Sequence, residues 1–295
     1  MENLAPVIIF AYNRPRHLRQ LLQSLSENDL ACHSDVFIYI DKPVKEIDIT
    51  NNQAVVNIAN EDWNFNNKKI IIRETNFGLR KNILSGISEV VSKYEKIIVL
   101  EDDLVLSKYF LKYMNEALFL YKEQNNVWHI AGFNYKTPSL ASRSSFFSSH
   151  MNCWGWATWE NRWHKISTDL QINISKEDID EFNFGNLIPN NYQQLLLNQQ
   201  EKISTWAIYW YQTIFLNNGL CLVPNKTLVF NDGFDGSGVN TSRVKYKLSK
   251  LNHNPIIKFP KDYRESVINR QFLKWYFLKL KIKDYVKYHI NKLSF

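Results

Sequence analysis

Short apolar runs alternate with amphipathic stretches through residues 1–132 of the chain. Runs of consecutive apolar and β-branched residues predict strands, and stretches with apolar residues three to four positions apart predict helices. The expected strands are Val7–Ala11, Val36–Asp41, Lys69–Arg73, Ile97–Glu101 and Trp128–Gly132, and the expected helices are Pro15–Ser26, Ile49–Asn60, Leu79–Ser92 and Ser107–Tyr121. This alternation is typical of an α/β fold with a mostly parallel sheet that helices cover on both faces.

The alternation ends near Gly132, and the chain beyond it is rich in polar and aromatic residues. We expect a polar helical stretch around Glu177–Gln200, an aromatic helix over Thr205–Leu216, and then a short hairpin. The two strands of that hairpin are Leu220–Val223 and Thr227–Phe230. The pattern predicts one domain over residues 1–245, with halves that meet at residues 132 and 133, and a tail over residues 246–295.

Three acidic residues, Glu101, Asp102 and Asp103, follow directly on the fourth expected strand. Carboxylates this close repel one another and favour a neutralising cation, and oxygen ligands suit Mg²⁺ or Mn²⁺. Ligands of open α/β sheets bind at the carboxyl ends of the strands, where these acids are expected to lie. The cluster therefore indicates metal-assisted binding of a diphosphate. The alternative is that Asp102 or Asp103 caps the following helix.

Other turns at the same edge of the expected sheet carry groups that bind nucleotides. Arg14 could pair with a phosphate, and Asp41 could accept a hydrogen bond from a base or a ribose. The alternative is that Asn13 caps the first helix and that Arg14 is solvated. The candidate residues in these turns are Tyr12, Asn13, Arg14, Asp41, Arg80 and Lys81.

The net charge of +7 is concentrated at the C-terminus. Residues 270–295 hold seven basic residues and one acid, a net charge of +6, and the other 269 residues carry +1. Lysines interleaved with aromatic residues indicate a segment that lies on an anionic membrane surface, with each cation contributing about 1 kcal/mol. The alternative is a C-terminal helix with a solvated face, because the lysines fall on two sides of a helical wheel.

Three widely separated cysteines, Cys32, Cys153 and Cys221, form no CxxC pair, so the sequence indicates neither a disulfide framework nor a zinc site. The first residues lack the basic region of a signal peptide, and no apolar run reaches the length of a membrane span. We therefore expect a cytoplasmic protein that is peripheral on the inner face of the plasma membrane.

Four segments together resemble the GT-A nucleotide-sugar glycosyltransferases of the bacterial family-2 type and, more distantly, N-acetylglucosaminyltransferase I. They are Val7–Pro15, Asn76–Asn82, Leu100–Asp103 and Trp154–Trp156. The resemblance spans Pro6–Thr241 and implies a nucleotide diphosphate sugar as donor and a divalent cation as cofactor. It also implies that residues 1–132 bind the donor and that residues 133–245 bind the acceptor.

The resemblance also implies roles for individual residues. The last acid of the family's Glu-Asp-Asp motif binds the metal ion, which corresponds to Asp103 here. The residues that correspond to donor contacts are Glu101 and Asp102 near the ribose and sugar, Arg14 and Asp41 at the nucleotide, and Arg80 and Lys81 near the base or diphosphate.

The catalytic base and the acceptor site are expected beyond residue 150. An inverting transfer needs a carboxylate to take the proton of the acceptor hydroxyl. The segment Trp154–Glu160 resembles the loop of β-galactosyltransferases whose last acid is the base, which points to Glu160, with Asp235 and Glu201 in reserve. Gly155 permits close backbone approach, and Trp154 and Trp156 offer flat faces to a sugar ring.

The sequence thus predicts a metal-dependent, inverting glycosyltransferase that acts on a glycan or lipid-linked glycan in lipopolysaccharide or capsule synthesis. A sugar nucleotidyltransferase is an alternative, although the first strand lacks a Gly-rich phosphate loop with a nearby Lys. A non-enzymatic nucleic-acid-binding protein is another, because the C-terminal segment is basic and aromatic. Nucleic-acid binding would leave the acidic cluster unexplained, so we expect no nucleic-acid partner.

Overall fold

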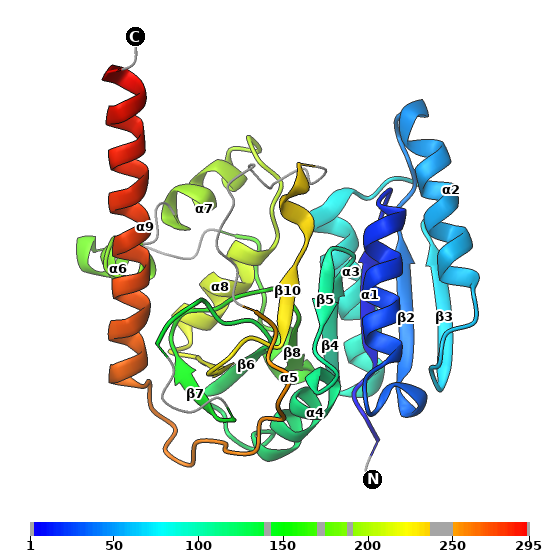
Figure 1. The fold of residues 1–295 in the computed structure, drawn as a ribbon, viewed down its shortest axis with the longest axis horizontal. Coiled ribbons are helices and arrows are strands. Elements are labelled where there is room, and N and C mark those ends of the chain that lie inside the picture. Colours follow the sequence, from blue (N-terminus) through cyan, green and yellow to red (C-terminus); the bar gives the residue numbers. More distant parts are fainter. Residues whose placement is uncertain (1–2, 139–142, 170–174, 188–190, 237–249, 294–295) are drawn as a thin grey trace.

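The computed structural model describes residues 3–138, 143–169, 175–187, 191–236 and 250–293, with side chains up to residue 282. An eight-stranded sheet forms the centre of the fold (Figure 1). Its strands are β1 (Val7–Ala11), β2 (Asp35–Ile40), β3 (Asn67–Ile72), β4 (Lys96–Glu101), β6 (Val127–Ala131), β7 (Ser145–Ser148), β8 (Trp156–Trp159) and β9 (Leu220–Pro224). Their order across the sheet is β3-β2-β1-β4-β8-β6-β9-β7.

Two further strands and the helices surround this sheet. The two strands are β5 (Leu104–Leu106) and β10 (Val229–Asn231), which pair with each other outside the large sheet. The α-helices are α1 (Pro15–Ser26), α2 (Glu46–Asn60), α3 (Gly78–Tyr94), α4 (Phe110–Leu120), α5 (Glu160–Trp163), α6 (Lys176–Phe182), α7 (Asn191–Gln199), α8 (Ala207–Leu216) and α9 (Val267–Leu293). Two 3₁₀ turns are η1 (Ala31–His33) and η2 (Gly233–Asp235).

The sheet is mostly parallel, as the sequence predicted. Strands β3, β2, β1 and β4 run parallel to their neighbours, and β6 is parallel to β9. Strand β8 lies between β4 and β6 and is antiparallel to both, and β7 is antiparallel to β9. The α/β fold class is therefore confirmed, with a strand from the second half of the chain inserted beside the acidic strand.

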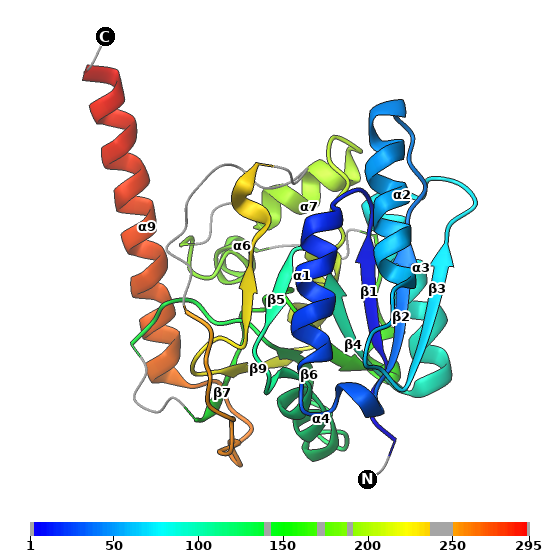
Figure 2. The same ribbon diagram turned by 45° about the vertical axis from the view of Figure 1, so that its right-hand side comes forward.

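Two hydrophobic cores lie on the two faces of the sheet. Because side chains alternate along a strand, Ile9 points into one core and Ile8 and Phe10 into the other. Helices α1, α2 and α4 supply the first core, and α3 and α8 supply the second. Figure 2 shows α1 and α2 in front of β1 and α3 behind the sheet. Burial on both faces explains why the central strand β1 is apolar throughout, whereas the edge strand β3 is half exposed and carries Lys68 and Lys69.

The predicted hairpin of residues 220–230 is wrong. Strand β9 belongs to the large sheet, whereas β10 pairs with β5 and places Asn231 opposite Leu104. The chain leaves the large sheet after Pro224, because the N–H of Leu228 bonds to the carbonyl of Gly132 at 2.8 Å. This departure carries the residues after β10 to the end of the acidic strand.

Two predicted helices also differ from the observed ones. The helix expected from residue 107 begins only at Phe110, because β5 occupies the residues after the acids. The stretch expected as one helix over residues 177–200 forms α6 and α7. Phe184, Gly185 and Asn186 have positive φ angles of 53°, 68° and 58°, which end α6.

Helix α9 lies at the β7 side of the body and extends beyond it at its C-terminal end (Figures 1 and 2). The segment before it runs along the body, where the N–H of Asn252 bonds to the carbonyl of Thr227 at 2.8 Å. Within the described residues, no helix combines the length and the apolar character that crossing a bilayer requires.

Candidate active site

The acids that follow β4 meet the turn that follows β1. Nη1 of Arg14 lies 3.0 Å from Oδ2 of Asp103, and Nε donates to Oδ2 of Asp102 at 3.3 Å. Nη2 of Arg14 also donates to Oδ1 of Asp102. The side chains of Asp102 and Asp103 are only 4% and 11% exposed. Adjacent parallel strands thus bring together two strand ends that are far apart in the sequence.

The predicted alternatives for these turns are wrong. Helix α4 begins with Tyr109 at its N-cap, so neither Asp102 nor Asp103 caps it. Helix α1 begins after Arg14, and no side chain caps it. Arg14 is the N-cap residue of α1, but its side chain pairs with the acids and makes no capping hydrogen bond.

Negative charge is only partly neutralised at this site. Burial and the neighbouring Asp103 raise the pKa of Glu101 to about 8. Burial raises the pKa of Asp102 to about 6, against the opposing effect of Arg14. Burial alone would lower the pKa of the Arg14 guanidinium, but Asp102 and Asp103 raise it above its usual value. Three carboxyl groups thus share one guanidinium, and a further cation would stabilise their ionised forms.

A divalent cation fits this chemistry if other molecules complete its shell. Asp103 offers carboxylate oxygens, the ligands that Mg²⁺ and Mn²⁺ prefer. Among the residues that the structure describes, no group of three or more His, Cys, Asp or Glu side chains is arranged to hold an ion. Such ions often bind through one or two carboxylates and take their remaining ligands from phosphates and water. The acids therefore suit a cation that arrives with a diphosphate.

The turn η2 packs directly on Asp103. The N–H of Asp232 bonds to the carbonyl of Asp103 at 2.8 Å, and that of Gly233 bonds to Oδ1 of Asn231 at 2.8 Å. A Cβ atom at Gly233 would overlap with Oδ2 of Asp103 and lie 3.0 Å from its Cγ. Only glycine therefore fits here without displacing the acid. The sequence interpretation missed Gly233, because nothing in the sequence pairs β10 with β5.

Arg16 and His17 hold the acids of η2 from the side of α1. Arg16 lies 3.0 Å from both Asp232 and Asp235. Nε2 of His17, which is buried, lies 3.3 Å from Oδ2 of Asp235. The sequence interpretation missed both basic residues, although they directly follow Arg14 and Pro15. The start of α1 thus contacts the acids after β4 and those of η2.

Asp41 holds the start of α3. Its two carboxylate oxygens accept the N–H groups of Phe77 and Gly78, each at 2.8 Å, and Oδ1 also accepts that of Lys42 at 3.0 Å. Gly78 has a φ of +69°, which favours glycine. These contacts assign Asp41 to the junction of β2 and α3, and its contact with a nucleotide stays a prediction.

Tyr12 and Asn13 join two turns at the carboxyl edge of the sheet. The hydroxyl of Tyr12 and the amide of Asn13 donate to the carboxylate of Asp48, at 3.1 and 2.7 Å. Nδ2 of Asn52 donates to the carbonyls of Tyr12 and Asp41, at 2.7 and 2.9 Å. The turns after β1 and β2 are therefore fixed to each other beside the acids.

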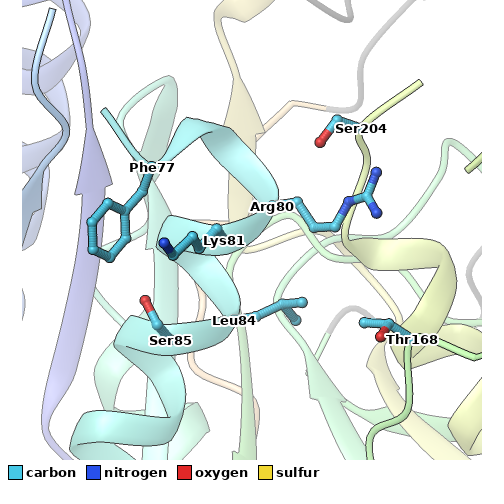
Figure 3. Close-up of a pocket in the computed structure, with 7 residues that line it drawn as sticks. All are labelled: Phe77, Arg80, Lys81, Leu84, Ser85, Thr168 and Ser204. Atoms are coloured by element: carbon cyan, nitrogen blue, oxygen red, sulfur yellow. The ribbon is translucent and has the colours of Figure 1, made fainter. Parts of the chain in front are cut away.

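Arg80 and Lys81 line a pocket of about 490 Å³ on the side of α3 (Figure 3). Figure 3 shows Arg80 extending toward Ser204, and Nη2 of Arg80 donates to the carbonyl of Ile203 at 3.0 Å. Nζ of Lys81 lies 4.3 Å from the ring centroid of Phe77. The lining residues are Phe77, Arg80, Lys81, Leu84, Ser85, Thr168 and Ser204, which include two cations and no carboxylate.

A short segment connects this pocket with the acidic cluster. Ser204 lines the pocket, and Trp206, two positions later, hydrogen-bonds to the carboxyl group of Glu101. Residues 203–206 thus contact Arg80 through the carbonyl of Ile203 and Glu101 through Trp206. The proximity of both cations to a base or diphosphate stays a prediction.

Trp156 belongs to the core, so the prediction that it faces the acceptor is wrong. Its side chain is fully buried, and its ring stacks on Trp206 and His129 with centroids 5.6 and 5.1 Å away. Trp154 is only partly buried, and its ring lies 4.5 Å from that of Phe133 and 5.6 Å from that of Phe234. Of the two tryptophans, only Trp154 has a surface that an acceptor could contact.

Gly155 is a point of close backbone approach, but the approach is to the protein itself. It has a φ of +62°, and its carbonyl accepts the N–H of Gly132 at 2.7 Å. A Cβ at Gly155 would lie 2.9 Å from a methyl group of Val229. The glycine therefore serves the packing of β10 against the sheet, and its predicted contact with an acceptor has no support.

Glu160 lies at the wrong edge of the sheet for the predicted base. Strand β8 runs antiparallel to β4, so Trp159 pairs with Lys96 at the start of the acidic strand. The N–H of Glu160 bonds to the carbonyl of Glu95 at 2.8 Å, and its carboxylate lies 3.2 Å from His164. The full length of β4 separates Glu160 from the acids, so it cannot take a proton there.

The two reserve acids have different surroundings. Asp235 belongs to the 3₁₀ turn whose Gly233 packs on Asp103, and its carboxylate lies 3.0 Å from Arg16 and 3.3 Å from His17. Glu201 is exposed and has a φ of +56° in the segment that leads to Ile203. Asp235 is therefore the predicted base candidate that the structure brings to the carboxyl edge.

The comparisons with solved structures include two of TarS from S. aureus. A crystal structure of its residues 1–349 shares 14% identity and covers 77% of this chain and 60% of that one, with a TM-score of 0.43. A second TarS crystal structure shares 14% identity and covers 77% and 36%, with a TM-score of 0.41. The chain thus matches less than two thirds of the length of either.

The family comparison covers more of the chain. A search of curated protein sequences gave no match. The model of glycosyl transferase family 2 matches residues 7–185, which is more than half of the chain. This range includes the turn after β1, the start of α3 and the acids after β4. The chain belongs to glycosyl transferase family 2 and has an α/β fold of the GT-A type.

Proposed function

We propose that the chain transfers a sugar from a nucleotide diphosphate donor to a hydroxyl of a glycan acceptor, with Mn²⁺ or Mg²⁺ as cofactor. The observation that carries this proposal is the meeting of Asp102, Asp103 and Arg14 at the carboxyl edge of the parallel strands. Open α/β sheets bind their ligands at this edge. Membership in the family favours a glycosyltransferase over a sugar nucleotidyltransferase.

Asp103 is the proposed metal ligand. When bound, the cation offsets the charge that develops on the leaving diphosphate. Arg14 fixes the carboxylates of Asp102 and Asp103, so its proposed role is to position them and to limit their repulsion. The proposed donor contacts are Tyr12, Asn13, Arg14, Asp41, Arg80, Lys81, Glu101 and Asp102.

Asp235 is the proposed catalytic base of an inverting transfer. The acceptor oxygen attacks the anomeric carbon, the bond from that carbon to the diphosphate oxygen breaks, and the hydroxyl proton passes to the carboxylate. The packing of Gly233 on Asp103 supports this choice, because it holds the same turn at the cluster. Trp154 is the proposed acceptor contact, because its ring is partly exposed.

The proposed acceptor is a glycan or a lipid-linked glycan in the synthesis of lipopolysaccharide or capsule. The proposed location is the inner face of the plasma membrane, reached through residues 270–295. The support for this setting is the net charge of +6 over those residues and the aromatic residues among them. Nucleic acid has no part in this function.

Loss of the metal ligand tests the proposal. We expect Asp103→Asn to lower donor hydrolysis and transfer at least a hundredfold, because a neutral amide binds a divalent cation poorly. The assay is hydrolysis of a panel of nucleotide sugars with and without Mn²⁺, together with thermal melting to verify the fold.

Glu160→Gln is the matched control, since it neutralises an acid at the opposite edge of the sheet. It should retain the activity of the unaltered protein. Full activity in Asp103→Asn, or an equal loss in Glu160→Gln, would overturn the assignment.

A further inference from the structure

Helix α9 exposes an apolar stripe along the side that faces away from the body. Four large apolar side chains form it: Ile268, Trp275, Leu278 and Ile282, with 59%, 46%, 44% and 54% of their surfaces exposed. Spacings of seven, three and four residues keep side chains on one face of a helix. The stripe spans about four helical turns and is interrupted by the exposed Gln271 between Ile268 and Trp275.

The opposite side of α9 is fixed to the body. Leu273 and Phe277 are 3% and 7% exposed and belong to a small core of their own. The guanidinium of Arg270 lies 2.6 Å from both Glu181 and Glu265. These contacts set the direction of the apolar stripe relative to the body. They also neutralise Arg270, which the sequence alone counted among the cations free to bind a partner.

Lysines border the apolar stripe on both sides. A rotation of 100° per residue places Lys274 and Lys281 along one border and Lys279 along the other. Lys279 and Lys281 are exposed. Nζ of Lys279 lies 3.4 Å from the ring centroid of Trp275, and Nζ of Lys281 donates to the carbonyl of Asn186 at 3.3 Å. Long lysine side chains can cover apolar surface with their stems and direct their ammonium groups outward. The lysines, which fall on two sides of the helical wheel, thus flank a single apolar face.

We propose that this face of α9 docks on a bilayer that contains anionic phospholipid, with the helix axis parallel to the surface. The apolar stripe would enter the interface of the bilayer, and Lys279 at the border of the stripe would meet lipid phosphates. A second copy of the chain is the other candidate occupant. It would bring together two segments that each keep a net charge of +5 once Arg270 is paired, and these repel each other, whereas lipid phosphates complement that charge. The proposal rests on the membrane location in the proposed function and gives that location a physical basis. Lipid binding can be measured independently of catalysis.

Vesicle co-sedimentation of the full chain tests this docking. We expect binding to phosphatidylcholine vesicles that contain phosphatidylglycerol, weaker binding at high salt, and little binding to phosphatidylcholine alone. Leu278→Glu with Ile282→Glu should weaken binding to the anionic vesicles at least tenfold. The matched control is Phe119→Glu with Leu120→Glu on α4, which changes two side chains that are 54% and 48% exposed.

The control pair should bind vesicles as the unaltered chain does, and both pairs should retain donor hydrolysis and melting temperature. Equal binding to neutral and anionic vesicles, or equal losses in the two pairs, would overturn the proposal. So would a dimer in sedimentation velocity that the α9 pair dissociates without any change in vesicle binding. A chain that binds vesicles but hydrolyses no nucleotide sugar would refute the proposed function and leave the docking supported.

Discussion

At the scale of single residues, the geometry of one guanidinium organises the acidic edge. Arg14 offers several N–H groups in a fixed plane and reaches Asp102 and Asp103 together, which the single ammonium of a lysine cannot reproduce. Removing one member of such a buried group leaves an uncompensated charge, at a cost of about 3–5 kcal/mol. Glu101 has no comparable partner, and Asp103 lies close enough to oppose its ionisation. The stability of the protein should therefore respond to the protonation of Glu101.

We expect the free energy of unfolding of the metal-free protein to fall as the pH rises from about 5 to about 8. The pKa of Glu101 is about 8 in the folded protein and 4.5 without its surroundings, so the folded state holds more protons in this interval. Asp102, with a pKa of about 6, acts in the same direction in the lower part of the interval. Urea unfolding at pH 5.5 and 8.5 with a chelator measures the change.

The variant Glu101→Gln is the control for this pH dependence. It removes the titrating group and should reduce the change in unfolding free energy by about 1 kcal/mol or more, since one pKa unit corresponds to about 1.4 kcal/mol. An unchanged pH dependence in this variant would show that other groups cause it.

At the scale of secondary-structure elements, the ribbon of β5 and β10 completes the site. It begins directly after Asp103 and pairs Leu104 with Asn231, so the turn η2 lies on the acids. Gly233 leaves no room for a side chain at this contact. The position of Asp103 therefore depends on a segment from the last third of the chain.

Gly233→Ala should lower donor hydrolysis at least tenfold while the protein stays folded, because the new methyl group displaces the Asp103 carboxylate. Gly185→Ala is a matched control, since a Cβ there would meet only Lys274, at 3.8 Å. Because Gly185 has a φ of +68°, the alanine should lower the free energy of unfolding by about 1 kcal/mol. The activity of this variant should not change. Activity assays and thermal melting of both variants distinguish a local displacement from general destabilisation.

The sequence predicted those elements and contacts that follow from local pattern. Strand β1 and helix α1 have the predicted bounds, because their apolar spacing is unambiguous. Arg14 and the acids after β4 were expected together, since ends of parallel strands share an edge. Strand β8 was not among the expected strands, and its antiparallel direction could not be predicted either, because a short strand reads the same in either orientation. Both Trp156 and Glu160 were therefore misplaced, and the contacts of Gly233 depend on a pairing between distant segments.

At the scale of the whole molecule, α9 is joined to the body mainly through its first half. Its described apolar contacts there involve Leu273 and Phe277, and Arg270 adds ion pairs to Glu181 and Glu265. The side chain of Arg270 is 16% exposed, so its ion pairs are partly protected from water. The second half of the helix extends past the body (Figure 1).

Arg270→Gln should loosen this attachment. We expect cleavage within α9 by a low concentration of trypsin to become several times faster, while donor hydrolysis is unchanged. The control is Arg264→Gln, which removes the ion pair between Arg264 and Asp262. The two side chains are 84% and 73% exposed, so this ion pair contributes little to stability. Equal cleavage rates in the two variants would show that the ion pairs of Arg270 do not hold the helix.

The short strand β8 also has a consequence for the order in which the chain is made. It pairs with β4 on one side and with β6 on the other, although both of those strands precede it in the sequence. Until residues 156–159 leave the ribosome, the edges of β4 and β6 that face β8 are bare, and bare edges invite pairing with other chains. A nascent or truncated chain that ends before β8 should therefore aggregate by pairing with other copies of itself. The four residues of β8 thus protect the edges of β4 and β6 from aggregation as well as joining the two parts of the sheet.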